Sequence, residues 1–220
     1  MFKLIFFIGL TLIPFACIAQ SDGSFEIARV QYRGGGDWYN DPSSLSNLIK
    51  FTNRVVPISI HTVYDDVALG SSNLHNYPFL YLTGHGTITA NNSEVQNLRT
   101  YLEHGGFLYI DDDYGLDSHI RNLMNRVFPD EEFIELPFNH PIYNQVFLFE
   151  HGLPKIHEHD NKAPRGYGLF YEGKLVMYYT YESNLGDGWA DVEVHNNPPQ
   201  KREEALKMGV NILVFALTRI

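Results

Sequence analysis

Hydrophobic positions along the chain switch repeatedly between a strand-like and a helix-like spacing. The segment 25–32 alternates in polarity, 58–60 is the short segment Ile-Ser-Ile, and 78–82 and 107–110 are apolar runs, so each of the four predicts a β-strand. Between them, apolar residues recur three and four positions apart, which predicts helices with one buried face: Leu45, Leu48 and Ile49; Val95, Leu98 and Leu102; and Ile120, Leu123, Met124, Val127 and Phe128. Strands that alternate with helices favour an α/β fold, a mainly parallel sheet with helices on both faces.

Local sequence signals indicate where two of these helices begin and where one of them ends. Asp41-Pro42-Ser43 predicts an Asx N-cap followed by proline at the first helical position. Ser93 and Gln96 have the spacing of a capping box, so a second helix is expected to open there. The pair Gly105-Gly106 is expected to end that helix before the strand at 107–110.

The pattern changes from His140 onward, where proline, glycine and histidine become frequent. Residues 169–179 predict a β-hairpin that turns at 172–174. The segment 202–219 has a helical stripe of apolar residues and is expected to pack back on the sheet. Residues 20–220 are therefore expected to form a single domain, with 140–200 as an irregular insertion that contains the hairpin.

The first 19 residues have the features of a secretory signal peptide. Lys3 precedes the apolar run 4–13, and small residues surround the expected cleavage point after Ala19. A membrane anchor and lipidation of Cys17 are the alternatives, but Pro14 and the shortness of the run count against a span. The mature chain is expected to be periplasmic or secreted and to have no stable membrane span.

Composition excludes several classes of function. The chain has 16 Lys and Arg residues against 26 Asp and Glu residues, a net charge of −10, so it lacks the basic surface that nucleic acid binding requires. Its single cysteine, Cys17, lies in the predicted signal peptide. The mature chain is therefore expected to have no disulfide, no thiolate metal site and no cysteine nucleophile.

Unusual sequences follow three of the predicted strands, at 33–38, 83–86 and 111–114. The carboxyl ends of parallel strands meet at one edge of a sheet, where ligands bind in open α/β folds. We therefore expect Asp37, His85 and Asp112 to lie in one crevice. Residues with the chemistry for catalysis are Asp112, Asp113 and His85, and those expected to bind a ligand are Gly35, Gly36, Asp37, Trp38, Gly84, Gly86, His140 and Trp189.

Each of these features also has a purely structural interpretation. The glycine run is not a dinucleotide fingerprint, because Tyr39 stands where the third glycine belongs, so it also fits a plain tight turn. Three adjacent aspartates repel one another, so unless they are well solvated one of them should have a raised pKa or bind a cation. The aspartate run equally fits a solvated strand end with one aspartate as a helix cap. Trp189 is either an aromatic platform or a buried anchor.

A second histidine group follows at His157 and His159. On a strand these two side chains would face the same side, as metal ligands often do, but nearby prolines favour a polar loop. The spacing is not that of the HExxH zinc motif, and no G-x-S-x-G elbow occurs in the chain. A zinc protease and a serine hydrolase of these types therefore lack support.

A set of ordered motifs strongly resembles a bacterial family named domain of unknown function 4159: Arg29-x-x-Tyr32, Gly35-Gly-Asp37-Trp38-Tyr39, Tyr77-Pro-Phe-Leu-Tyr-Leu-Thr-Gly84-His85-Gly86, Gly105-Gly-Phe-Leu-x-x-Asp111-Asp112, Phe128-Pro129, His140-Pro141 and Gly209-Val-Asn-Ile212. The resemblance covers about residues 25–220. It implies a flavodoxin-like three-layer sandwich similar to class I glutamine amidotransferases and trehalose-utilisation-like proteins, and it brings no established activity. Amidotransferases place a cysteine nucleophile on the turn after a central strand, where this chain has Asp111–Asp113. Glutamine hydrolysis of that kind is therefore not expected.

Two functions from different classes remain after these exclusions. The first is a non-catalytic ligand-binding or assembly module, because the sequence offers no complete catalytic triad; its partner is a small molecule, a glycan or a protein. The alternative is a metal- or carboxylate-dependent hydrolase or sugar-modifying enzyme that uses Asp112, Asp113 and His85. An oxidoreductase has least support, since there is no fingerprint for its cofactor. The sequence names no cofactor and no particular metal.

Overall fold

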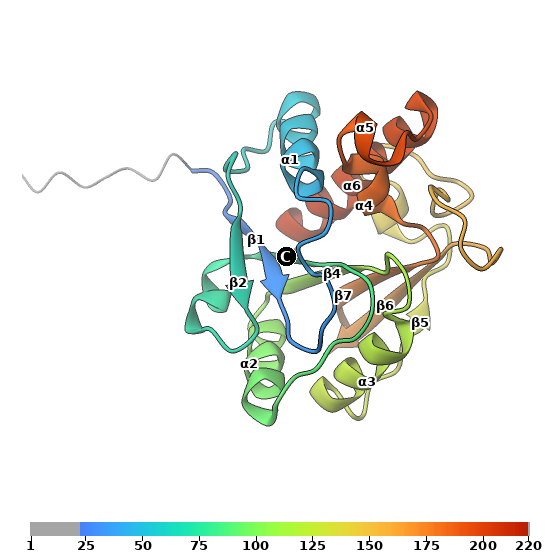
Figure 1. Cartoon of the computed structure of the whole chain (residues 1–220). Coiled ribbons are helices and arrows are strands. Elements are labelled where there is room, and N and C mark those ends of the chain that lie inside the picture. The colour runs from blue at the N-terminus through green and yellow to red at the C-terminus, as the bar shows by residue number, and fades with distance from the viewer. Residues whose placement is uncertain (1–22, 220) are drawn as a thin grey trace, which may run out of the picture.

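The computed structural model describes residues 23–219 as an α/β fold with three layers (Figure 1). The predicted signal peptide, with Cys17, lies outside the described residues. Within the described part of the chain, no helix has the length and apolar character needed to cross a membrane.

A seven-stranded sheet forms the middle layer of the described residues, in the order β2-β1-β3-β4-β7-β6-β5. Neighbouring strands from β2 to β7 pair in parallel, and β6 runs antiparallel to both of its neighbours. The strands are β1 (Ile27–Gln31), β2 (Asp65–Ala68), β3 (Phe79–Leu82), β4 (Phe107–Asp111), β5 (Ile134–Glu135), β6 (Arg165–Tyr171) and β7 (Lys174–Tyr181). This mainly parallel sheet confirms the predicted fold class.

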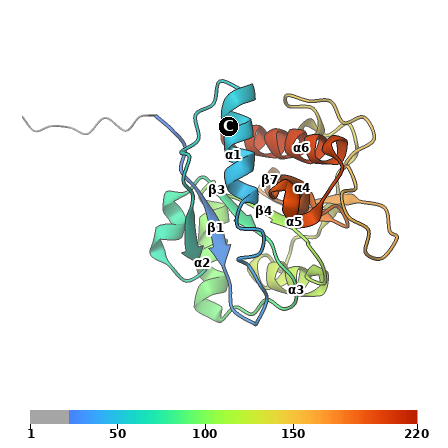
Figure 2. The same ribbon diagram turned by 45° about the horizontal axis from the view of Figure 1, so that its top comes forward.

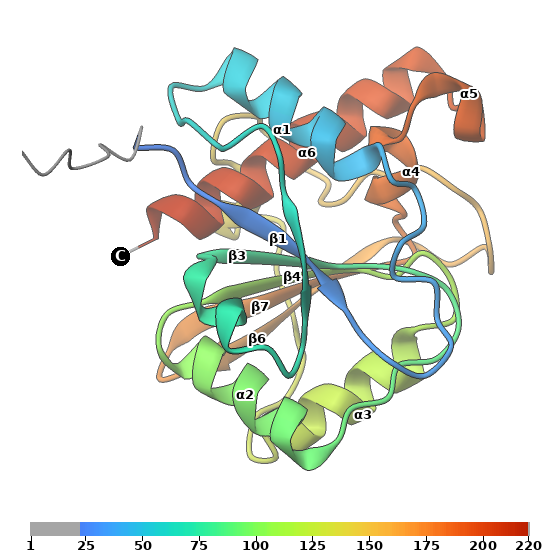
Figure 3. The same cartoon turned by 60° about the vertical axis from the view of Figure 1, so that its left-hand side comes forward.

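Helices cover both faces of the sheet. Figure 3 shows α1, α4 and α6 on one side and α2 and α3 on the other, and Figure 2 shows the same separation from a second direction. The helices are α1 (Ser44–Val55), α2 (Asn92–Glu103), α3 (Asp117–Val127), α4 (Leu185–Trp189), α5 (Val192–His195) and α6 (Pro199–Thr218), with 3-10 turns η1 (Ser72–Asn76) and η2 (Pro141–Tyr143). The final helix packs back on the sheet, as predicted.

Aromatic side chains fill the core between the sheet and the α1–α6 layer. Tyr81, Tyr109 and Tyr178 are cross-strand neighbours on β3, β4 and β7, and their rings stack at centroid distances of 5.6 and 6.2 Å. Trp189 lies over Tyr81 and Tyr109 with no exposed surface, and its indole N–H donates to the carbonyl of Ala205. Of the two interpretations of Trp189, the structure supports the buried anchor. A fully buried ring offers no platform for a ligand.

The predicted hairpin is confirmed and belongs to the main sheet. β6 and β7 pair antiparallel, and β7 also pairs in parallel with β4. Glu172 and Gly173 both have positive φ, at 49° and 75°, as expected in a two-residue turn that matches strand twist. The strand β7 thus places its carboxyl end beside that of β4.

Two predicted helix starts were wrong in detail. The first turn of α1 begins at Ser44, because Asp41 adopts φ 45° and its carboxylate contacts His195 at 2.9 Å instead of capping the helix. The capping box of α2 uses Asn91 and Glu94, which exchange hydrogen bonds of 2.9 and 2.7 Å. At α1 the contact with His195 takes the predicted cap residue, and at α2 the capping box forms two residues earlier than predicted.

The second strand was predicted at the wrong place. In the segment predicted as a strand at 58–60, Ile60 makes only an isolated bridge to Phe25. The strand beside β1 is β2, at Asp65–Ala68, where Val67 is the single buried residue. An edge strand with so little buried surface has no apolar run, so the pattern did not reveal it.

Candidate functional site

The candidate site lies at the carboxyl ends of β1 and β3, where the strand order changes direction. The chain leaves β1 toward β2 at the edge and returns to β3 on the other side of β1. Two loops that follow these strands bond to each other through their backbones: Asp37 N–H to His85 O at 3.3 Å, Gly36 N–H to Thr87 O at 3.1 Å, and Thr89 N–H to Arg33 O at 2.6 Å. Such switch points are where open α/β sheets bind ligands.

Glycines allow these two loops to approach closely. A Cβ atom on Gly36 would lie 2.7 Å from the carbonyl oxygen of His85, and one on Gly84, at φ 135°, would overlap the Tyr32 hydroxyl. Gly35 and Gly86 also have positive φ, with more open surroundings. The structure thus gives Gly36 and Gly84 a packing role. Ligand binding by Gly35, Gly36, Gly84 and Gly86 stays a prediction.

His85 lies between two carboxylates at this edge. Its Nδ1 is 3.1 Å from Oδ2 of Asp37 and 3.2 Å from Oδ2 of Asp113, and its side chain is 47% exposed. The other oxygen of Asp37 accepts the backbone N–H of His85, which fixes the carboxylate beside the ring. Asp37, His85 and Asp113 are therefore brought together as three of the predicted site residues.

The three consecutive aspartates point in different directions. Asp111 accepts bonds of 2.6 Å from the Thr180 hydroxyl and from the Gly186 N–H. Asp112 accepts the N–H of Leu116 at the start of α3, so its carboxylate is turned away from His85. The prediction that the Asp112 side chain lies beside His85 was wrong. Successive residues of an extended segment face opposite sides, so Asp113 faces His85 and Asp112 faces away from it.

Burial perturbs the acidity of all three aspartates. It raises the pKa of Asp111 to about 6 and also raises that of Asp112. The pKa of Asp113 is raised by burial and by the negative charge of Asp187, whose own pKa is raised by burial and by the carboxylates of Asp41 and Asp111. Groups with such shifts gather at functional sites more often than elsewhere.

A cavity of about 360 Å³ opens on the side of Asp113 that faces α3. Asp113 and Asp112 form part of its wall, and Tyr114 stacks on His159 at 4.5 Å. The cavity is lined by polar and aromatic residues: Asp112, Asp113, Tyr114, Gly115, Asp117, Ser118, His159, Asp160, Lys162, Tyr181, Glu182 and Asn184. Its size and lining suit a small polar ligand.

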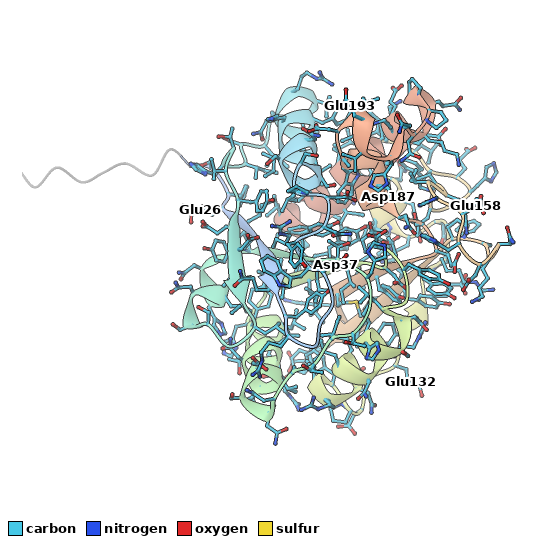
Figure 4. All side chains as sticks on the ribbon, in the orientation of Figure 1. Glu26, Asp37, Glu132, Glu158, Asp187 and Glu193 are labelled. Atoms are coloured by element: carbon cyan, nitrogen blue, oxygen red, sulfur yellow. The ribbon has the colours of Figure 1, made fainter. Side chains whose placement is uncertain are left out.

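A second polar group lies next to Asp113; of its members, His157 was considered from the sequence, whereas Asp41, Asp187 and His195 were missed as site residues. Asp187 contacts His157 at 3.0 Å and His195 at 3.6 Å, and His195 also contacts Asp41 at 2.9 Å. Figure 4 labels Asp37 and Asp187 near the middle of the view, whereas Glu132 lies toward the rim. The signal in the sequence was Asp187 between two glycines, in a segment singled out only for Trp189.

The structure places the remaining predicted residues away from His85 or in a supporting role. His140 contacts Phe215 at a ring distance of 5.6 Å, and Phe215 in turn contacts Phe107 at the amino end of β4, so His140 lies at the opposite edge of the sheet. Trp38 is half-buried and covered by the guanidinium of Arg29 at 5.3 Å. The His140 prediction is therefore not supported by its position.

The fold and the site define an α/β protein with a histidine- and aspartate-rich site at the carboxyl edge of its sheet. Residues 26–217 match the family described as Domain of unknown function (DUF4159), and the chain belongs to this family. No curated protein matches the chain. The similarity to class I glutamine amidotransferases stays a prediction.

Proposed function

We propose that this protein is a hydrolase in which His85 acts as the general base and acid. The observation that carries this proposal is the position of the His85 ring, whose Nδ1 lies within 3.2 Å of both Asp37 and Asp113. A carboxylate at Nδ1 holds the proton on that nitrogen and leaves Nε2 free to accept one. Nε2 has no hydrogen-bond partner among residues 23–219, and nearly half of the side chain is exposed.

The reaction that this arrangement supports uses water as the nucleophile. Nε2 of His85 removes a proton from water, the water oxygen forms a bond to the electrophilic atom, and the leaving group departs with its bonding electrons. The protonated His85 then returns its proton to the leaving group, so no external acid is needed. The Asp37 carboxylate stabilises the positive charge that the ring carries between the two proton transfers.

We infer the substrate class from the neighbouring cavity, which Asp113 connects to His85. Its wall carries several acidic side chains, with Lys162 as a cationic one and the rings of Tyr114 and Tyr181. Such a surface favours a polar, hydroxyl-rich molecule over an apolar or polyanionic one. The alternative, a binding module without turnover, would use the same cavity without His85 chemistry.

Kinetic measurements on chromogenic substrates test the proposal. 4-Nitrophenyl glycosides, esters and phosphates are compared, and His85→Ala is expected to lower kcat by about 10²–10⁴-fold with little change in KM. Asp37→Asn should lower kcat as well, because it removes the carboxylate that orients the ring. His75→Ala is the matched control, since this histidine is exposed and contacts Asn97 far from the site.

The outcomes separate the two functions. Hydrolysis that is lost in His85→Ala supports the hydrolase. Turnover that is unchanged in His85→Ala would contradict it. Glycan binding to the wild-type protein without hydrolysis of any substrate would instead favour the non-catalytic module.

A further inference from the structure

Asp41, Asp187 and His195 come from three separate segments and converge on one point. The Asp41 carboxylate lies in the loop before α1, Asp187 lies in α4 and His195 ends α5. One ligand atom from each residue lies within 4.8 Å of the other two. Nε2 of His195 is 2.9 Å from Asp41 and 3.6 Å from Asp187.

These separations fit a single bound metal ion. A tetrahedral metal about 2.1 Å from each ligand atom places two ligand atoms about 3.4 Å apart. The distance of 3.6 Å between Asp187 Oδ1 and His195 Nε2 is close to that value. The distance of 2.9 Å between Asp41 and His195 is shorter than that value, so metal binding requires the Asp41 carboxylate to shift.

The negative charge of the Asp41 and Asp187 carboxylates also favours a bound cation. Asp187 is almost fully buried, with 2% of its side chain exposed, and Asp41 is 11% exposed. Among the described residues, the ion-pair partners of these two carboxylates are histidines, and no lysine or arginine pairs with either. A buried pair of carboxylates is normally compensated by a positive charge or by a metal.

A separate observation comes from two asparagines that bond to Asp113, which itself lies next to Asp187. Asn184 is 1% exposed, and its Nδ2 donates to the carboxylate of Asp113, which itself interacts with Asp187. The Oδ1 atoms of Asn184 and Asn40 are buried and have no hydrogen-bond partner among the described residues. A buried amide oxygen without a donor is uncommon, and a hydrated metal ion supplies donors through its bound waters.

We propose that Asp41, Asp187 and His195 bind one divalent transition-metal ion, with water completing its coordination. Two carboxylate oxygens and one imidazole nitrogen, without a thiolate, are a ligand set for Zn²⁺ or Mn²⁺. His157, which contacts the second oxygen of Asp187 at 3.0 Å, holds that carboxylate in position. The metal site uses none of the residues that orient His85, so it goes beyond the proposed hydrolase and is tested without a substrate.

Calorimetric titration of the purified protein, stripped with a chelator, tests the site. ZnCl₂ and MnCl₂ are each titrated, and one ion per chain is expected. His195→Ala and Asp187→Asn should each weaken binding by at least about 10-fold. Asp41→Asn gives a third measurement, so the test does not depend on one variant that fails to fold.

A spectroscopic measurement identifies the ligands. Co²⁺ bound in place of the native ion should give visible absorption bands that change in His195→Ala, because a nitrogen ligand is lost. His75→Ala and Asp130→Asn are matched controls, since both residues are exposed and lie outside the group, and they should bind as the wild type does.

Two results would overturn the proposal. One is the absence of stoichiometric binding of either ion to the folded wild-type protein. The other is binding of equal affinity in wild type and in folded His195→Ala or Asp187→Asn, which would place the ion elsewhere. Because neither measurement involves hydrolysis, loss of the metal site and loss of the proposed His85 activity are distinguishable.

Discussion

The hydroxyl of Tyr179 on β7 donates a hydrogen bond of 2.9 Å to Oδ2 of Asp112 at the end of β4. The other oxygen of Asp112 accepts the N–H of Leu116 at 3.0 Å, immediately before α3. One carboxylate thus ties two strands to the start of a helix. This arrangement assigns Asp112 a structural role that differs from the role of its neighbour Asp113.

Replacement of Asp112 tests this division of roles. Asp112→Ala leaves the N–H of Leu116 without its acceptor and removes one of the two carboxylates that accept from the Tyr179 hydroxyl, so the free energy of unfolding should fall by about 1–3 kcal/mol. Asp112→Asn is the control, because its amide oxygen preserves an acceptor. Urea unfolding of both variants measures the difference, and an Ala variant as stable as the Asn variant would contradict this structural role.

The buried carboxyl of Asp111 predicts a pH dependence of stability. Burial raises its pKa to about 6 in the folded chain, above the value of about 3.9 in an unfolded one, so the folded state binds its proton more tightly. The contribution of Asp111 to stability therefore grows as the pH falls through 6 and is complete below the unfolded value. At neutral pH the ionised group costs about 2–3 kcal/mol relative to its protonated form.

Asp111→Asn isolates this contribution. Other groups also titrate, so urea unfolding of wild type and variant is compared at about pH 5 and about pH 7.5. The variant should lose the part of the pH dependence that Asp111 supplies, with the wild type gaining more stability on acidification. Parallel pH profiles for the two proteins would show that Asp111 does not titrate as predicted.

The contact between the two glycine-containing loops predicts a large effect at Gly36. A Cβ atom there would meet the carbonyl oxygens of His85 and Thr87 at 2.7 and 2.9 Å, both of them backbone atoms. Gly36→Ala should therefore destabilise the protein by about 1–3 kcal/mol and displace His85. Gly70→Ala is the control, since its nearest neighbour is the flexible side chain of Glu94 at 3.3 Å, and equal melting temperatures would argue against close packing.

Export of the chain is predicted from its first 19 residues. Cleavage after Ala19 would leave Gln20 as the amino terminus of a periplasmic or secreted protein. N-terminal sequencing of protein from fractionated cells measures this directly. Met1 retained in a membrane fraction, or a lipid on Cys17, would show that the segment is an anchor.

The order of elements was predictable because burial leaves a periodic pattern. The run 107–110 is apolar at every position, as a strand covered on both faces must be, and the structure confirms it as part of β4. Strand β2 left no such pattern, because aspartates occupy two of its four positions and Val67 alone is buried. Prediction thus succeeded where both faces are covered and failed at the sheet edge.

The candidate site was predictable only in part, for a different physical reason. Asp37, His85 and Asp113 follow strand ends, and parallel topology alone brings strand ends together. Asp187 and His195 lie in short helices after β7, and their positions depend on how α4 packs against α1 and α6 and on how α5 packs against α4. No local pattern encodes that packing.

The parallel pairing of β7 with β4 has a consequence for how the protein is made. Strand β4 ends at residue 111, but the strand that completes this part of the sheet begins at residue 174, and Asp187 and His195 follow it. While the ribosome has synthesised only the first 170 residues, the loops that hold His85 exist without the partners that Asp113 meets in Asn184 and Asp187. The site is therefore completed last, when Asn184, Asp187 and His195 are added to the Asp37, His85 and Asp113 that the unfinished chain already contains.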